Sequence, residues 1–267
     1  MARYVTVFFL LLFSQSLLAN ERQDPVLAVI DFYPFGYLLD DNIARGMVFD
    51  IEAVLEEVST LNIDAKLMST PRALRSASNG QIDLLFSYKD DEMVPNVTWL
   101  GNVGCLTPLV VPLKDSNIKT LSDLAGKRVG FVGLGYFDIK MKSRWPIKPV
   151  ILNNNFIMLK MLLRGRLDAI IVNNGVLNAF LANQDILEDL PESWPLQLSQ
   201  PLPLDTYETH LSMSKDSNFQ ALIPQLKSAI VKARQQGRFR DIFQKYGSKL
   251  GGHCFTNEER KLHQWLK

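Results

Sequence analysis

Residues that bind metal ions are scarce in this sequence. The 267 residues include two cysteines and three histidines, and neither a Cys-x-x-Cys nor a His-Glu-x-x-His pattern occurs. Structural zinc sites need closely spaced Cys and His ligands of this kind. The sequence therefore predicts no structural zinc, and we expect no cofactor.

The chain also has almost no net charge. Lys and Arg number 29 against 28 Asp and Glu, so the formal net charge is +1. A near-neutral chain has no broad electrostatic attraction for nucleic-acid phosphates or anionic lipids. With 47% hydrophobic and 21% charged residues, the composition is that of an ordinary globular protein, and we expect no nucleic-acid partner.

The only long hydrophobic run lies at the N-terminus. Arg3 precedes the apolar run VTVFFLLLF (5–13), and the small residues of SQSLLA then lead into the polar NERQDP. Ser14 interrupts the run well before the roughly 20 apolar residues that a membrane-spanning helix needs. The pattern predicts a secretory signal peptide over residues 1–19, a mature chain from about Asn20, and a periplasmic protein. An uncleaved anchor is the alternative, and without a Cys after the cleavage point a lipoprotein is not expected.

The two cysteines, Cys105 and Cys254, allow one disulfide in an exported chain. This disulfide would close a loop of about 150 residues and add roughly 5 kcal/mol on the chain-entropy view. Two buried free thiols are the alternative interpretation, and the sequence does not separate the two.

Strand and helix patterns alternate along the first part of the chain. Residues 25–32 are typical of a buried strand, and apolar residues recur at helical spacing over 48–61. A strand is expected over 62–69, a helix over 70–80, and a buried strand over 82–87. A β-α-β-α-β series of this kind predicts an α/β sheet with helices on both faces.

A second series follows an extended segment at 105–116. We expect a short helix with Thr120 or Ser122 as its cap, and then two strands, a helix, a third strand, an extended crossing and two terminal helices. Their ranges are 121–126, 127–133, 148–152, 156–165, 167–174, 209–217 and 219–247. Two α/β series joined by two extended segments predict two lobes with a ligand cleft between them.

Five motifs stand in an order and spacing that are specific, although each is weak alone. They are YPFGYLLDDNIARGMVFDIEAVLEEV, GQIDLLFS, IKTLSDLAGKRVGFVGLG, LLRGRLDAIIVNNGVLNAFL and LKSAIVKARQQGRFRDIFQKYG. On these motifs the chain resembles, over nearly its whole mature length, the family 3 extracellular solute-binding proteins of ABC importers, the group that includes the polar amino-acid binders.

This resemblance implies a periplasmic-binding-protein-like type II fold. Lobe 1 would comprise 22–110 plus 210–267 and lobe 2 would comprise 111–209, with hinges around 109–114 and 208–213. The partners implied are a small-molecule ligand and the membrane permease of an ABC importer, and we expect a monomer.

Both charged anchors of amino-acid recognition are missing from the positions that the resemblance indicates. Amino-acid-binding relatives hold the ligand carboxylate with an Arg and its ammonium with an Asp. Here Glu92 and Met93 fall near the place of the Arg, and Asn173 falls at the place of the Asp. Ser87 and Lys89 fall where the family has small hydroxyl donors.

Loss of both anchors suits a ligand that is neutral or differently charged, because an unpaired buried charge is costly. Asn173 or Asn174 could exchange hydrogen bonds with such a ligand, and Ser87, Tyr88 and Lys89 are the nearest groups of the first lobe. The alternative for the charged run 89–92 is a solvated loop beside the cleft.

Other candidate ligand residues lie at the cleft mouth in this interpretation. Tyr33 and Phe35 could stack on a flat ligand, with core packing as the alternative. Arg72 could reach the cleft or lie on the surface. Tyr136 follows the glycine-containing loop where relatives have a ligand-binding Thr, and Asp205 could replace a missing charge near the hinge.

An enzyme is the less favoured class. The same scaffold carries dehydratases, and the candidate acids and bases are Glu92, Asp205, Glu208 and His210. The sequence contains neither a phosphate-binding loop nor a dinucleotide-binding glycine pattern. We therefore expect a binding protein without catalytic residues, with a ligand-sensing partner of a membrane receptor as the alternative to transport.

Overall fold

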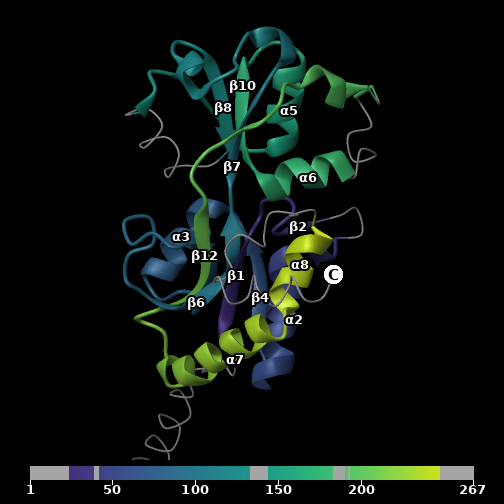
Figure 1. Ribbon diagram of the computed structural model, residues 1–267. Coiled ribbons are helices and arrows are strands. Elements are labelled where there is room, and N and C mark those ends of the chain that lie inside the picture. The colour runs from purple at the N-terminus through teal and green to yellow at the C-terminus, as the bar shows by residue number, and fades with distance from the viewer. Residues whose placement is uncertain (1–23, 39–41, 133–143, 183–189, 192, 247–267) are drawn as a thin grey trace, which may run out of the picture.

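A computed structural model describes residues 24–38, 42–132, 144–182, 190–191 and 193–246. It contains two five-stranded sheets that lie in separate lobes, one above the other in Figure 1. The predicted α/β fold with two lobes is confirmed.

The first sheet has the strand order β4-β1-β5-β12-β6. β1 runs parallel to β4 and β5, whereas β12 is antiparallel to both of its neighbours. The strands are β1 (Val26–Ile30), β4 (Asp64–Met68), β5 (Leu84–Tyr88), β6 (Val97–Leu106) and β12 (Tyr207–Ser214).

Helices cover both faces of this sheet (Figure 1), in keeping with β1, which is apolar at every position, and β5, which is apolar up to Phe86. Leu27 and Val29 pack into the core shared with the helices on one face, while Val26 and Ala28 pack with Ala73 on the other. The helices are α2 (Met47–Ser59), α7 (Ile223–Gln235) and α8 (Arg238–Lys245) on the first face and α3 (Thr70–Ser78) on the second.

The second sheet has the order β11-β7-β10-β8-β9. Its strands are β7 (Pro108–Pro112), β8 (Arg128–Val132), β9 (Lys148–Leu152), β10 (Ala169–Asn173) and β11 (Leu202–Pro203). Helix α5 (Asn155–Leu163) packs against β8 and β10, and helix α6 (Asn174–Ala182) packs against β10.

Smaller elements complete the described chain. They are a ribbon of β2 (Tyr37–Leu38) and β3 (Ala44–Arg45), and the 3-10 helices Lys114–Ser116, Leu121–Leu124, Trp194–Gln197 and Gln220–Leu222. The short helix expected at 121–126 is the second of these. Of the two caps considered, Thr120 is the cap, and it forms a capping box with Asp123.

The chain passes between the sheets at two places that touch each other. β6 gives way to β7 at Thr107, and β11 is separated from β12 by residues 204–206. The hydroxyl oxygens of Thr107 and Thr206 lie 2.8 Å apart. The expected hinges around 109–114 and 208–213 lie just after these crossings along the chain. The hinges and the expected lobe boundaries stay predictions.

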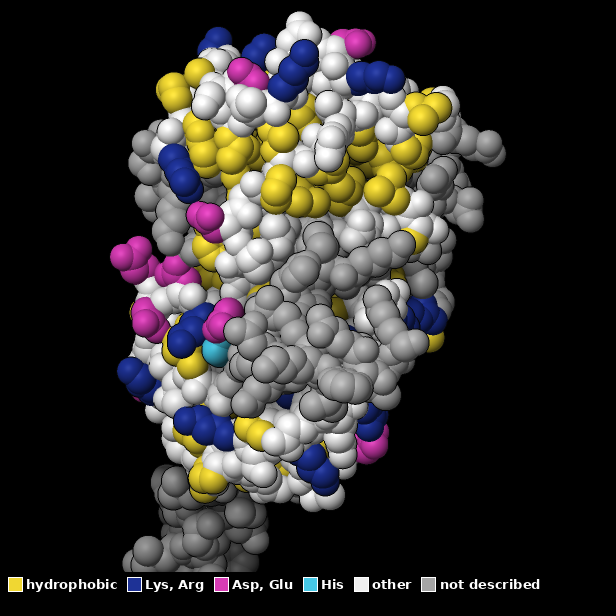
Figure 2. All heavy atoms as spheres, in the orientation of Figure 1, with side chains coloured by type: hydrophobic (Ala, Val, Ile, Leu, Met, Phe, Trp, Pro, Cys, Tyr) yellow, Lys and Arg dark blue, Asp and Glu magenta, His cyan; other side chains and the backbone are white. Residues whose placement is uncertain are grey.

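Hydrophobic surface gathers on the upper lobe. Figure 2 shows a broad band of hydrophobic side chains there, surrounded by Lys, Arg, Asp and Glu. Ile151, Ile157, Leu181 and Leu196 of this lobe are exposed. In the described part of the chain, no helix is both long enough and apolar enough to cross a membrane.

Candidate functional site

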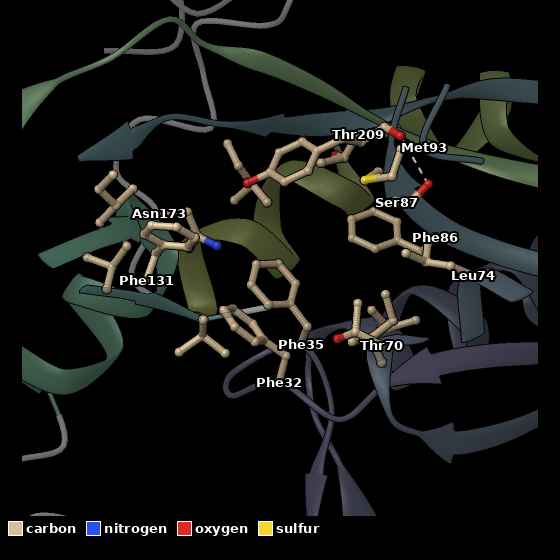
Figure 3. Close-up of a pocket in the computed structure, with 17 residues that line it drawn as sticks. Phe32, Phe35, Thr70, Leu74, Phe86, Ser87, Met93, Phe131, Asn173 and Thr209 are labelled. Atoms are coloured by element: carbon tan, nitrogen blue, oxygen red, sulfur yellow. Dashed lines mark hydrogen bonds between the residues drawn. The ribbon is translucent and has the colours of Figure 1, made fainter. Parts of the chain in front are cut away.

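A cavity of about 160 Å³ opens between the two sheets. Both lobes contribute to its wall, and Figure 3 shows the side chains converging on it. The apolar residues of the wall are Ile30, Phe32, Phe35, Val48, Leu74, Phe86, Met93, Leu106, Phe131, Val132, Ile171 and Val172, and the polar ones are Thr70, Ser87, Tyr88, Asn173 and Thr209.

The ends of parallel strands explain why these residues meet. Ile30 ends β1, residues 86–88 end β5, residues 131–132 end β8, and residues 171–173 end β10. In open α/β sheets, ligands bind outside the carboxyl ends of the strands. Each sheet directs those ends toward the cavity, so both lobes present the edge that such folds use for binding.

The described wall of the cavity is uncharged. Within the part of the chain that the structure describes, no Lys, Arg, His, Asp or Glu side chain lines the cavity. A charged ligand group would therefore leave water without meeting an opposite charge on these residues, which is unfavourable.

Asn173 supplies a hydrogen-bond donor to the cavity. It is the last residue of β10, and its Oδ1 accepts the backbone N–H of Val176, 2.9 Å away, in the first turn of α6. This hydrogen bond fixes the orientation of the amide. The other amide atom, Nδ2, points into the cavity in Figure 3.

Aromatic rings form much of the first-lobe side. The rings of Phe35 and Phe86 are nearly parallel, with centroids 6.3 Å apart and an interplanar angle of 25°. Phe32 lies 5.9 Å from Phe35. Phe131 extends the aromatic wall from the second sheet. Flat apolar walls of this kind suit a ring-bearing ligand.

Two hydroxyls at the first-lobe end of the wall differ in their bonding. Ser87 Oγ donates to the backbone carbonyl of Tyr88 at 3.0 Å. Thr209, 1% exposed, has an Oγ1 without a hydrogen-bond partner among the described residues. A buried hydroxyl normally has such a partner.

Tyr33 belongs to an aromatic contact between the lobes and does not line the cavity. Its ring stacks on Phe180 of α6 at 6.0 Å and lies 5.5 Å from Phe156 of α5. On its own lobe it meets Tyr37 at 5.0 Å. The structure therefore places Tyr33 beside the cavity, in contact with rings of the second lobe.

Four of the predicted ligand residues come together in the cavity wall: Phe35, Ser87, Tyr88 and Asn173. Asn174, one residue further, is buried and points elsewhere. Its backbone N–H donates to the carbonyl of Thr107, and its Oδ1 accepts the N–H of Thr107. It therefore fixes α6 to the segment that crosses between the sheets.

The three charged candidates lie outside the cavity wall. Arg72 on α3 and Lys89 after β5 are exposed. Asp205 is exposed and pairs with Arg144 at 3.3 Å. Two further predictions, Tyr136 and Cys254, lie outside the described residues. Cys105 is disulfide-bonded, and the pairing of Cys105 with Cys254 stays a prediction.

The charged run after β5 shapes a turn beside the site. Asp90 Oδ1 accepts the backbone N–H groups of Glu92 and Met93 at 2.9 and 3.0 Å. Asp91 accepts a hydrogen bond from the indole of Trp99 at 2.7 Å. The run thus ends in a local turn that delivers Met93 to the cavity, whereas Glu92 is exposed.

The acid and base candidates of β12 are engaged with each other. His210 Nε2 lies 2.8 Å from Glu208 Oε2, and neither residue lines the cavity. Burial lowers the pKa of His210, although Glu208 opposes that shift. The hydrogen bond from His210 lowers the pKa of Glu208. Over the described residues, no cluster of three or more His, Cys, Asp or Glu could hold a metal ion.

No protein-family model matches the sequence, and no curated protein matches it. Solved structures do match. A histidine kinase sensor domain with similarity to periplasmic binding proteins aligns with a TM-score of 0.70 at 14% identity, over 86% of this chain and 98% of that chain. The fold is that of the periplasmic binding proteins.

Two other matches have the same fold. The arginine-, lysine-, histidine-binding protein ArtJ from Geobacillus stearothermophilus aligns with a TM-score of 0.69 at 18% identity, over 85% of this chain and 96% of that one. A mutant of ArgBP from T. maritima aligns with a TM-score of 0.66 at 20% identity, over 85% and 95%.

Sequence reasoning missed several wall residues of this periplasmic-binding-protein fold. Phe131, Thr70 and Thr209 line the cavity but were not among the candidates. Phe131 stands at the end of an expected strand, so its position there was a usable signal. The sequence around Thr209 gave no such signal, because Thr209 reaches the cavity wall only through the insertion of β12 between β5 and β6.

Proposed function

We propose that this protein is an exported binding protein that captures a small solute between its lobes. The observation that carries the proposal is the cavity at the strand ends, to which both lobes contribute. Solved structures with this fold include the substrate-binding protein of an amino acid ABC transporter, with a TM-score of 0.67 and 18% identity. The periplasm is the compartment in which such a protein would work.

Capture would involve hinge closure at the two crossing segments. Thr107 and Thr206 bond to each other where the chain passes between the sheets. Few backbone dihedrals have to change at such a point for one lobe to rotate on the other. A ligand held by both walls would shift the population toward the closed form, in which the aromatic contact of Tyr33 is made.

The partner proposed is the membrane permease of an ABC importer, to which a monomeric binding protein would deliver its ligand. A sensing role is the second candidate, since a histidine kinase sensor domain shares the fold. Reconstituted uptake distinguishes the two. Ligand uptake into proteoliposomes that contain the permease and ATPase encoded by neighbouring genes supports transport. A ligand-dependent change in the activity of a receptor kinase supports sensing.

We propose that the protein has no catalytic residues. The acid and base candidates Glu92, Asp205, Glu208 and His210 all lie outside the described wall of the cavity. General acid or base catalysis requires a titratable group within hydrogen-bond reach of the reacting atom. Mass spectrometry of any bound compound after long incubation should recover it unchanged, and a new product would contradict this proposal.

A thermal-shift screen of the mature protein tests the binding function. The panel should contain amino acids, amines, organic acids, sugars and uncharged aromatic compounds. A ligand at 100 times its Kd adds about 2.7 kcal/mol to the free energy of unfolding, which is a readily measured shift in Tm. A panel without any stabilising compound would contradict the proposed function.

A further inference from the structure

The group that the second lobe offers to a ligand is a hydrogen-bond donor. Asn173 Oδ1 is already used by the N–H of Val176, so the amide presents Nδ2 to the cavity (Figure 3). An N–H donor meets an acceptor oxygen or nitrogen and repels an ammonium group. The resemblance assigns this position to an Asp that accepts hydrogen bonds from an ammonium group. In this protein the same position offers a hydrogen-bond donor.

Among its described residues, the first lobe offers no counter-charge in the cavity wall either. The nearest cationic candidates, Arg72 and Lys89, are exposed and do not line the cavity. The described wall contributes only hydroxyl and amide groups among apolar side chains. A carboxylate that entered would lose its hydration without a charged partner, which disfavours its ionised form.

The size and shape of the cavity suit a ring. Its volume of about 160 Å³ is close to that of an apolar protein cavity of about 150 Å³ that binds benzene. The rings of Phe35 and Phe86 provide a nearly parallel pair of faces on the first-lobe side, and Phe131 lies on the other lobe. Offset or edge contacts with such rings favour an aromatic ligand.

We propose that the cavity binds an uncharged, ring-bearing molecule whose hydrogen-bond acceptor meets Asn173 Nδ2. This inference rests on the proposed binding function and specifies its ligand class. It separates the protein from a binder of zwitterionic amino acids.

A series of four compounds with one phenyl ring and different charges tests the inference. These are 3-phenylpropanamide (neutral), 3-phenylpropanoate (anion), phenethylamine (cation at pH 7) and L-phenylalanine (zwitterion). Calorimetric titration at pH 7 gives each Kd. We expect the neutral amide to bind about tenfold or more tightly than each charged compound. Equal or tighter binding of any charged member, or no binding of the amide, would overturn the ligand class.

An isosteric variant tests the role of Asn173. In Asn173→Asp one carboxylate oxygen can still accept the Val176 N–H, while the other puts an anionic acceptor in the cavity. We expect the Kd of the amide to rise about tenfold and the Kd of phenethylamine to fall. Asn153→Asp adds the same charge at an exposed position and should change neither value. An unchanged preference in Asn173→Asp would overturn the assignment of Nδ2.

The outcome also separates this inference from the function it rests on. If an amino acid or sugar stabilises the protein in the wider panel while the amide does not bind, the ligand class is wrong and the binding function stands. If neither the series nor the wider panel binds, both are wrong.

Discussion

Thr209 is one of four described residues that have a buried polar side-chain atom without a hydrogen-bond partner. Its hydroxyl is buried and has no hydrogen-bond partner in the described structure. An unmade hydrogen bond of a buried group costs roughly 1–3 kcal/mol. Thr209→Val removes the hydroxyl and keeps the shape, so we expect the ligand-free protein to become about 1 kcal/mol more stable in urea unfolding.

A hydrogen-bonded hydroxyl in the turn after β12 provides the control for that variant. Ser217 Oγ donates to buried Asp83 Oδ1 at 2.7 Å. Ser217→Ala should therefore destabilise the protein by about 1–3 kcal/mol, since it leaves a buried carboxylate with one donor fewer. Destabilisation by Thr209→Val to the same extent would show that its hydroxyl is hydrogen-bonded after all.

The exposed cations near the site provide a second prediction at the residue scale. Arg72 and Lys89 lie outside the cavity wall. Arg72→Ala and Lys89→Ala should each leave the Kd of the best ligand within about twofold, because contacts screened by water contribute little. Titration calorimetry measures both. A tenfold loss in either variant would place that cation in the site.

At the scale of elements, helix α2 carries a carboxyl group with a raised pKa. Burial, together with repulsion from Glu56 and Asp64, raises the pKa of Glu52 to about 7. A raised folded-state pKa stabilises the fold below the unfolded pKa, and this contribution is lost as the pH rises through the folded pKa. We expect Glu52→Gln to be more stable than the wild type at pH 8, by about 1 kcal/mol because the site is half exposed, and similar at pH 4.

A neighbouring carboxylate on the same helix should give the opposite sign. Glu57 accepts hydrogen bonds from Arg238, which lower its pKa. Glu57→Gln should therefore lower stability at pH 8, since it removes the partner of that guanidinium. Urea unfolding at pH 4 and pH 8 measures the stability of both variants. A Glu52→Gln variant that is less stable than the wild type at pH 8 would contradict the raised pKa of Glu52.

Helix α5 takes part in the contact between the lobes. Phe156 lies 5.5 Å from Tyr33 and 5.2 Å from Phe180. Aromatic pairs add about 0.5–1.5 kcal/mol beyond area burial, so Phe156→Leu should favour the open form and raise ligand Kd by up to about tenfold. Small-angle scattering should show a larger radius of gyration. Ile157→Ala, at an exposed position of the same helix, is the control. An unchanged ligand Kd and radius of gyration in Phe156→Leu would refute the role of this contact.

Periodicity predicted most of the longer elements of both lobes, and two that it missed, β6 and α6, have physical causes. β6 contains Gly101, Asn102 and Gly104, which read as a loop. Gly104 is needed because a Cβ there would collide with the ring of Phe243. α6 starts directly after β10 with Asn and Gly, residues typical of a turn, so its first turn resembled a strand end.

The site was less predictable than the fold because its wall combines residues from both lobes. Ser87 and Asn173 were indicated by the family resemblance, which aligns two strand ends of this sequence with ligand-binding positions of the relatives. Thr209 and Met93 depend on strand order and on the turn at Asp90, which no local pattern reveals. The missing charges at the expected anchor positions were nevertheless informative, since the described wall carries no charge.

At the scale of the whole molecule, the account requires that the ligand bind between the lobes. Leu74 of α3 lines the cavity and is only partly buried, so a larger side chain can occupy the cavity there with little disturbance of the core. In Leu74→Trp the indole should take the place of the ligand, while the far-UV circular dichroism spectrum stays that of the wild type.

The direct measurement is the thermal shift of wild type and Leu74→Trp with the tightest compound of the panel. At 100 times its Kd, the account predicts about 2.7 kcal/mol of stabilisation for the wild type and none for Leu74→Trp. Equal stabilisation of both proteins would place the ligand elsewhere and contradict capture between the lobes.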